Sequence, residues 1–142
     1  MSHIRPFRAI RAANSLAQFV IAPPYDVMSE AEARALLAAN PRSFVRVSRP
    51  EVVLPAGADS HAPEAYAAAH AEFAAMRTAG LLVQDDTDAY YLYGQKMGDH
   101  AQVGLVACFS VDEYDRGLIK KHEFTRPDKE KDRVDHIDAT NC

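Results

Sequence analysis

The 142-residue chain has few of the features that mark disulfide-rich or membrane proteins. Its two cysteines, Cys108 and Cys142, are too few and too far apart for a disulfide framework or a zinc site. We expect Cys108, within GLVACFSV, to be a small buried residue. No stretch approaches the ~18 apolar residues of a membrane span, and the N-terminal MSHIRPFRAIR lacks the apolar core of a signal peptide. We therefore predict a cytoplasmic protein without membrane contact.

The chain also lacks an excess of positive charge, because its net charge is -4 at pH 7. Proteins that coat nucleic acids usually present a strongly basic face, so this part of the chain is not expected to bind nucleic acid. The chain also lacks a glycine-rich phosphate loop, a paired-glycine Rossmann turn, a His-Glu-x-x-His helix and a serine elbow. We assign no metal-ligating residue.

Capping residues, proline and glycine mark where helices begin and end. Ser29, followed three residues later by Glu32, forms a capping box that predicts a helix over residues 29–40. Pro63 and Gly80 bound a second predicted helix over residues 63–80. Between them, residues 43–55 alternate apolar and polar side chains, as in a half-buried strand.

Other strands are expected at residues 19–22, 90–95 and 103–111, the last two joined by the turn sequence MGDH. Tyr91, Tyr93 and Phe109 are predicted to lie in the core. A C-terminal helix is predicted from about residue 128. The expected fold class is α+β, with a mixed, mainly antiparallel sheet, two main helices and this C-terminal helix.

The sequence APPYD contains two consecutive prolines, which predict a stiff, exposed turn. Such a turn would hold Tyr25 and Asp26 out as candidate substrate-binding residues. The alternative is that Asp26 caps the turn and Tyr25 packs on a neighbouring strand. Both interpretations stand at this point.

The most charged stretch, IKKHEFTRPDKEKDR at residues 119–133, divides at Pro127. After the proline, alternating charges predict a salt-bridged surface helix whose strong apolar anchors are Val134 and Ile137. Before it, Glu123 lies among Lys120, Lys121, His122 and Arg126, as a general base among cations could. Arginine and lysine side chains suit phosphate oxygens, so Lys121, Arg126, Lys129 and Arg133 are candidate phosphate- or substrate-binding residues.

Several stretches together resemble the domain of unknown function family 1015. They are RPFRAIR at 5–11, APPYDVMS at 22–29, NPRSFVRVSRPE at 40–51, EFAAMRTAGLLVQD at 72–85, YYLYGQK at 90–96 and GLVACFSVDEYDRGLIKKHEFTRPDKEKDR at 104–133. The order of motifs in that family, a His-Glu segment followed by Asp-Gly-His-His-Arg, is similar to that of ParB-related free serine kinases. The resemblance implies that Glu123 activates a hydroxyl, with His122 beside it.

The resemblance also implies the reaction and the extent of the protein. It implies phosphoryl transfer from a nucleotide to a small hydroxy amino acid, with Mg²⁺ assisting charge neutralisation. The Asp-Gly-His-His-Arg motif is absent from the chain. We therefore expect residues 1–142 to be the N-terminal part of a longer protein, with little activity alone.

Two other functions remain open. One is a non-enzymatic nucleotide-binding or DNA-partitioning-like module. The other is a structural accessory domain whose charged run is a solvated face.

Overall fold

The computed structural model describes residues 2–120 and 126–141, and the chain divides into two compact units. Unit 1 consists of Met1–Arg11 and Gln84–Phe124, and unit 2 consists of Ala12–Val83 and Thr125–Cys142. The described strands form three two-stranded sheets, β1–β6, β2–β3 and β4–β5, instead of one mixed sheet. Helices and short antiparallel strands together make the fold α+β, as predicted.

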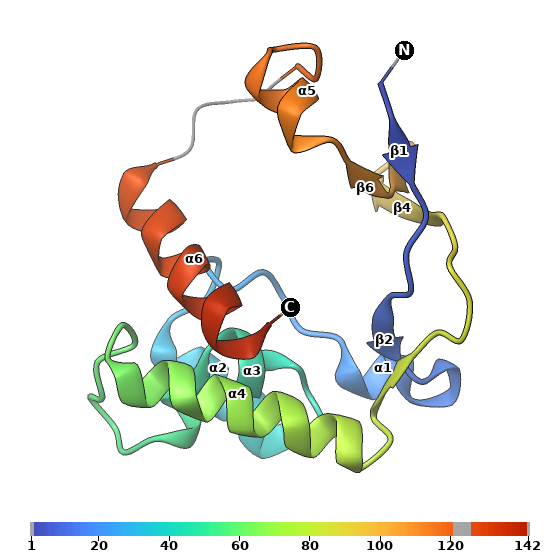
Figure 1. Ribbon diagram of the computed structural model, residues 1–142. Coiled ribbons are helices and arrows are strands. Elements are labelled where there is room, and N and C mark those ends of the chain that lie inside the picture. Colours follow the sequence, from blue (N-terminus) through green and yellow to red (C-terminus); the bar gives the residue numbers. More distant parts are fainter. Residues whose placement is uncertain (1, 121–125, 142) are drawn as a thin grey trace. The chain divides into compact units, whose positions relative to one another are not determined.

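Unit 2 is mainly helical (Figure 1). Its longest helix, α4, contacts α6, α3 and η2, while α2 contacts α3 and η2. Ala65 and Ala69 of α4 are fully buried, and their small side chains allow neighbouring helices to approach closely. The bounds are η1 Asn14–Leu16, α1 Ala17–Val20, α2 Glu30–Ala39, α3 Val45–Ser48, η2 Pro50–Val53, α4 Pro63–Thr78 and α6 Pro127–Thr140; β2 is Ile10–Ala12 and β3 is Leu82–Gln84.

The predicted helix boundaries are confirmed. Ser29 accepts a hydrogen bond from the Glu32 backbone while the Glu32 side chain accepts one from the Ser29 backbone, which completes the capping box of α2. Pro63 occupies the first turn of α4, and Gly80 follows that helix with φ +70, a value that glycine adopts without strain. Pro127 occupies the first turn of α6.

The strand predicted over residues 43–55 is wrong, because the structure has α3 and η2 there. Val45 and Val47 are both fully buried although residues two apart lie on different sides of a helix. Since α3 contacts α2, α4 and η2, it is covered on more than one side. Burial on several sides of a short helix therefore produced the two-residue alternation of a strand.

The strand predicted over residues 19–22 is also wrong, since α1 ends at Val20. The backbone carbonyls there have partners other than a neighbouring strand. Phe19 accepts a hydrogen bond from Asn40 Nδ2, Val20 accepts from the Phe44 N–H, and Ile21 accepts from Ser43 Oγ. The turn after it is confirmed, with the Val27 N–H donating to the Pro24 carbonyl.

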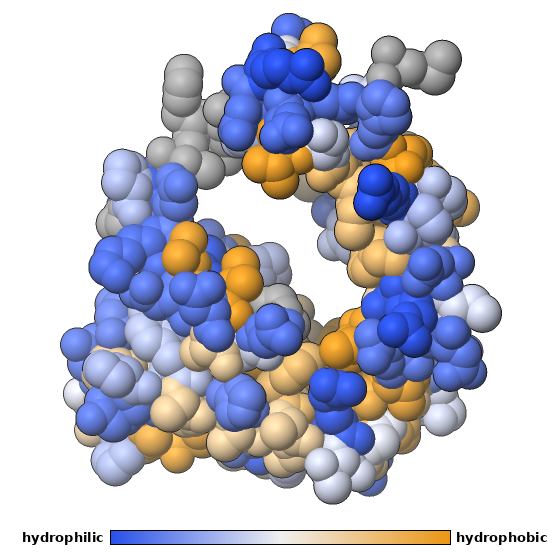
Figure 2. Space-filling model, viewed as in Figure 1, coloured by the Kyte–Doolittle hydropathy of each residue, from blue (hydrophilic) through white to orange (hydrophobic). Residues whose placement is uncertain are grey.

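Polar residues hold α6 against the other helices of unit 2. The expected apolar anchors Val134 and Ile137 are 49% and 51% exposed, and Figure 2 shows hydrophobic groups among the hydrophilic surface of this helix. Among the α6 side chains that the structure describes, the buried ones are instead Asp132, His136 and Thr140. The interpretation of α6 as a solvated, salt-bridged face therefore holds for its exposed Lys131–Asp135 pair and is wrong for the side on which Asp132 lies.

Unit 1 is built from a hairpin and a smaller strand pair. The predicted hairpin is confirmed as β4 (Tyr91–Met97) and β5 (His100–Val106), and β1 (Ile4–Arg5) pairs with β6 (Cys108–Phe109). Helix α5 (Val111–Asp115) follows Ser110, whose side chain caps it.

Most of the residues predicted to be buried in unit 1 are exposed, so that prediction is wrong for them. Tyr93 and Phe109 are 59% and 49% exposed, and Cys108 is exposed rather than buried. The hairpin has only two strands, so most of its side chains on both faces are exposed. Tyr91 is half-buried, and its hydroxyl accepts a hydrogen bond from the Ala9 N–H and lies 2.7 Å from Asp85 Oδ2.

Candidate functional site

Unit 2 contains a pocket of about 240 Å³. Its walls come from the turn before α2, from the segment joining α3 to η2, from the loop before α4 with the start of that helix, and from α6. Charged and polar side chains dominate the lining, so the pocket favours a polar ligand. The lining residues are Tyr25, Asp26, Met28, Ser48, Arg49, Pro50, Glu51, Ser60, His61, Tyr66, Lys129, Asp132, Arg133 and His136.

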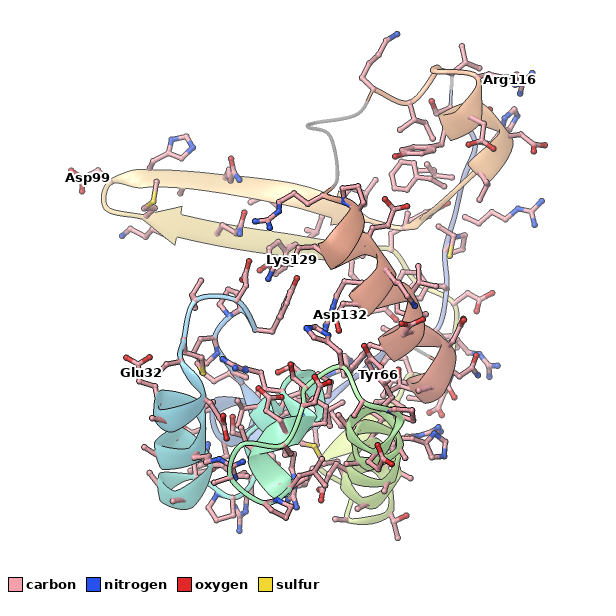
Figure 3. All side chains as sticks on the ribbon, turned by 90° about the vertical axis from the view of Figure 1, so that its left-hand side faces the viewer. Glu32, Tyr66, Asp99, Arg116, Lys129 and Asp132 are labelled. Carbon is pink, nitrogen blue, oxygen red and sulfur yellow. The ribbon has the colours of Figure 1, made fainter. Side chains whose placement is uncertain are left out.

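The buried carboxylate of Asp132 is a hub of hydrogen bonds in this pocket. Its Oδ1 accepts from the Tyr66 hydroxyl at 3.0 Å and from His61 Nδ1 at 2.9 Å. Its Oδ2 accepts from Arg133 Nε at 3.1 Å and Nη2 at 2.5 Å. Figure 3 shows Tyr66 of α4 and Asp132 of α6 side by side, with Lys129 nearer the start of α6. Four donor atoms therefore fix this carboxylate.

These contacts shift two ionisation equilibria in opposite directions. Burial alone would raise the pKa of Asp132, but the hydrogen bonds from Arg133 and Tyr66 outweigh it and lower that pKa. Burial and the hydrogen bond to Asp132 raise the pKa of Tyr66 to about 12. Near pH 7 Asp132 is therefore a carboxylate and Tyr66 a neutral donor.

Two cations of α6 surround the ring of Tyr25. Arg133 Cζ lies 4.0 Å from the ring centroid and Lys129 Nζ lies 5.2 Å from it, both within the range of cation–π attraction. Asp26, the next residue in the turn, also lines the pocket. Among the residues that the structure describes, neither Lys129 nor Asp26 forms an ion pair.

A second buried ion pair, Arg49–Glu51, also lines the pocket. Arg49 donates through Nε and Nη2 to Glu51 Oε1, both at 2.7 Å, and through Nη1 to the Met28 carbonyl. Arg34 of α2 donates to the carbonyls of Val52 and Leu54 at 2.9 Å and to that of Glu51 at 2.7 Å. These arginines connect η2 to α2 and to the turn that carries Asp26.

His136 anchors α6 to α3. Its Nε2 lies 2.8 Å from the Val47 carbonyl, which can only accept, so Nε2 carries a proton. The hydroxyl of Thr140 donates to the His136 carbonyl at 2.8 Å. This buried contact sets the position of α6 at the pocket.

The family model of the protein of unknown function family DUF1015 matches residues 4–142. The chain belongs to this family. No curated protein and no solved structure matches the DUF1015 chain significantly.

The structure brings together four of the residues singled out in the sequence of this DUF1015 chain. Tyr25, Asp26, Lys129 and Arg133 all line the pocket. Arg126 is exposed and immediately precedes α6. Lys121, His122 and Glu123 lie outside the described residues, so their predicted roles stay predictions.

The sequence-based prediction missed other lining residues, chiefly His61, Tyr66, Arg49, Glu51 and Asp132. A signal for Asp132 was present in the spacing of α6. Lys129, Asp132, Arg133 and His136 follow one another at intervals of three, one and three residues, which places them on one side of a helix. The sequence-based interpretation considered only the balance of acidic and basic residues in this helix, and so it did not recognise that these four polar residues share one side. His61 carries no comparable signal, because a loop contributes it.

The described residues contain no group of three or more His, Cys, Asp or Glu side chains placed to hold a metal ion. Within the same residues no helix is long and apolar enough to cross a membrane.

The lowered pKa of Asp132 predicts a pH-dependent contribution to stability. A carboxyl group with a lower pKa in the folded state stabilises the protein fully above its unfolded pKa, about 3.9, and that stabilisation is lost as pH falls below this value. We expect the difference in urea midpoint between Asp132 and Asp132→Asn, both compared in a His61→Gln background so that no imidazole faces the carboxylate, to be constant from pH 7 to about pH 5 and to shrink as the pH approaches 3. Unfolding followed by circular dichroism across this range measures it. A difference that grows on acidification would contradict the assignment.

Proposed function

We propose that the chain takes part in phosphoryl transfer from a nucleotide to a small hydroxy amino acid, and that the unit 2 pocket binds the amino acid. The observation that carries the proposal is a cation and an anion without ion-pair partners among the described residues, Lys129 and Asp26, at one pocket. An amino acid carries both complementary charges. A cytoplasmic location, as the sequence predicts, would supply both substrates.

Size and polarity support this ligand class. Pockets for drug-sized ligands usually measure about 300–1,000 Å³, so a volume of about 240 Å³ suits a smaller molecule. Arg133 and Arg49 are already engaged by Asp132 and Glu51, which leaves Lys129 as the cation available to a carboxylate. The Ser48 Oγ atom is buried with no hydrogen-bond partner among the described residues and can bond a ligand hydroxyl.

The binding site is tested by Lys129→Met, measured by calorimetry with L-serine. Loss of one charge-assisted hydrogen bond, about 1.5–3 kcal/mol, should weaken binding roughly tenfold or more. Ethanolamine lacks the carboxylate, so wild type and variant should bind it equally. Lys131→Met is the matched control, because Lys131 lies on the same helix, is 77% exposed and pairs with Asp135. Equal serine affinity in wild type and Lys129→Met would reject the site.

The reaction is tested by incubating the full-length protein with serine and a nucleoside triphosphate labelled on its γ-phosphate, because little activity is expected of residues 1–142 alone. Labelled phosphoserine is the expected product. Nucleotide binding without transfer would favour the non-enzymatic nucleotide-binding or DNA-partitioning-like alternative, and binding of neither substrate would favour a structural accessory domain. Glu123, with His122 beside it, is the sequence-based candidate for the base, and Glu123→Gln tests it in the same assay.

A further inference from the structure

His61 carries its proton on a defined nitrogen. Its Nδ1 lies 2.9 Å from Asp132 Oδ1, and an ionised carboxylate can only accept a hydrogen bond. Nδ1 is therefore the donor, and the neutral imidazole keeps its lone pair on Nε2. This arrangement of carboxylate and imidazole prepares Nε2 to accept a proton.

The carboxylate that orients His61 is itself held in place. Asp132 has a side chain only 9% exposed, and it accepts from Tyr66 on the same oxygen as His61 and from Arg133 on the other. A charge fixed by several donors need not reorganise when the imidazole becomes positive. Asp132 and Tyr66 can therefore act as positioning residues for His61.

His61 is accessible to ligands while its partner is buried. Its side chain is 64% exposed and lines the pocket that contains Lys129 and Asp26. It also lines a second, shallower hollow of about 710 Å³ with Tyr66 and residues of α4 and α6. The imidazole thus lies at a wall shared by two adjoining hollows, where a transfer between two bound molecules can take place.

We propose that His61, rather than Glu123, takes the proton from the acceptor hydroxyl during phosphoryl transfer. The proposal rests on the function proposed above. The hydroxyl oxygen forms a bond to the γ-phosphorus of the nucleoside triphosphate, and its proton moves to His61 Nε2. The bond from that phosphorus to the bridging oxygen breaks, and the nucleoside diphosphate leaves with the electron pair. His61 then releases the proton to solvent.

The charged surroundings of His61 shape the pH dependence of this step. An ionised carboxylate beside an imidazole favours the charged imidazolium, and a cation opposes it. The side chains that contribute from its own loop and from the neighbouring helices are Asp59, Tyr66, His70, Lys129, Asp132, Arg133, Asp135 and Asp138. A general base acts only while it is unprotonated, so a step that uses an imidazole base is slower at acidic pH.

The test compares His61→Gln, Glu123→Gln and His100→Gln in the labelled-phosphate assay. General-base catalysis contributes about 10²–10⁴-fold, so His61→Gln should lower kcat by at least 100-fold while changing serine affinity less than threefold. The remaining rate should lose the acidic limb of the pH profile. His100→Gln is the control, because His100 is exposed, lies on β5 and lines neither hollow; it should leave kcat and the profile unchanged.

Three outcomes separate the proposals. Wild-type kcat and an unchanged acidic limb in His61→Gln, with loss of both in Glu123→Gln, would overturn the role of His61 and leave the proposed function standing. Absence of transfer by the full-length wild type would overturn both. Nitrogen-15 NMR gives an independent readout: the Nδ1–H tautomer should be lost in Asp132→Ala, and serine should shift Nε2 of His61 but not that of His100. No shift at His61 would remove it from the site.

Discussion

Replacing Asp132 with alanine is expected to lower the free energy of unfolding by about 3 kcal/mol. The substitution removes the acceptor for the Tyr66 hydroxyl, for His61 Nδ1 and for both Arg133 nitrogens. Hydrogen bonds to a charged group contribute about 1.5–3 kcal/mol, and donors left without a partner in a buried place add to the loss. Because the exposed part of Arg133 can turn to water, the estimate stays at the lower end of the range for breaking buried ion pairs.

Asp135→Ala is the matched control for this prediction. It makes the same substitution on the same helix, so both variants gain the same helix propensity. Asp135 pairs with the exposed Lys131, and such surface pairs contribute about 0–1 kcal/mol. Urea unfolding of both variants at pH 7 measures the difference. Equal losses for the two would mean that the Asp132 contacts add nothing to stability.

Replacing Met76 with alanine is expected to cost about 3 kcal/mol of unfolding free energy. Met76 lies near the end of α4 and is 1% exposed, the largest of the fully buried side chains among the described residues. Truncation removes buried methylene and thioether groups and leaves a cavity that the surrounding helices fill only in part. Methionine-to-alanine changes in cores cost about 2–5 kcal/mol for this reason.

Met97→Ala supplies the comparison, since Met97 is 82% exposed at the end of β4. Its loss should stay within about 0.5 kcal/mol, as for most surface substitutions. Both variants replace methionine with alanine, and the two sites differ in how deeply the methionine side chain is buried. A Met76→Ala loss below about 1 kcal/mol would show that the unit repacks around the missing side chain.

Local signals predicted α2, α4, α6 and the β4–β5 hairpin well. The Ser29–Glu32 capping box and the prolines at positions 63 and 127 act within a few residues, so they can be recognised without knowing the rest of the fold. The β4–β5 hairpin is similarly marked by its Gly98 turn, where φ is +59.

Burial patterns set by distant contacts were not predictable in this way. Val45 and Val47 are buried because three other elements surround a single helical turn, and their spacing alone indicates a strand. Tyr93 and Phe109 have the composition of core residues but lie on two-stranded sheets. In both cases the number of packed neighbours decided the outcome, and that number is a tertiary property.

Four of the eight candidate residues singled out in the sequence line the pocket, and most of its fourteen lining residues were not predicted. Charge type identified Lys129 and Arg133, and the stiff double-proline turn identified Tyr25 and Asp26. Asp132 was interpreted as one charge in a balanced surface run, because its burial depends on Tyr66 and His61, which are 66 and 71 residues away in the sequence. Contacts between residues this far apart leave no recognisable pattern in the sequence around either residue.

Unit 2 consists of two stretches of the chain that are separated by most of unit 1, and this affects how the protein folds. Residues 84–124 of unit 1 are made between α4 and α6, so a ribosome completes the hairpin before the helix that carries Asp132 emerges. Long-range closures of this kind slow folding, although the entropy cost grows by only about 0.6 kcal/mol per doubling of loop length. A nascent chain that stops short of α6 therefore has Tyr66 and His61 but no partner for either. Acquisition of serine binding during translation should mark the moment at which α6 docks.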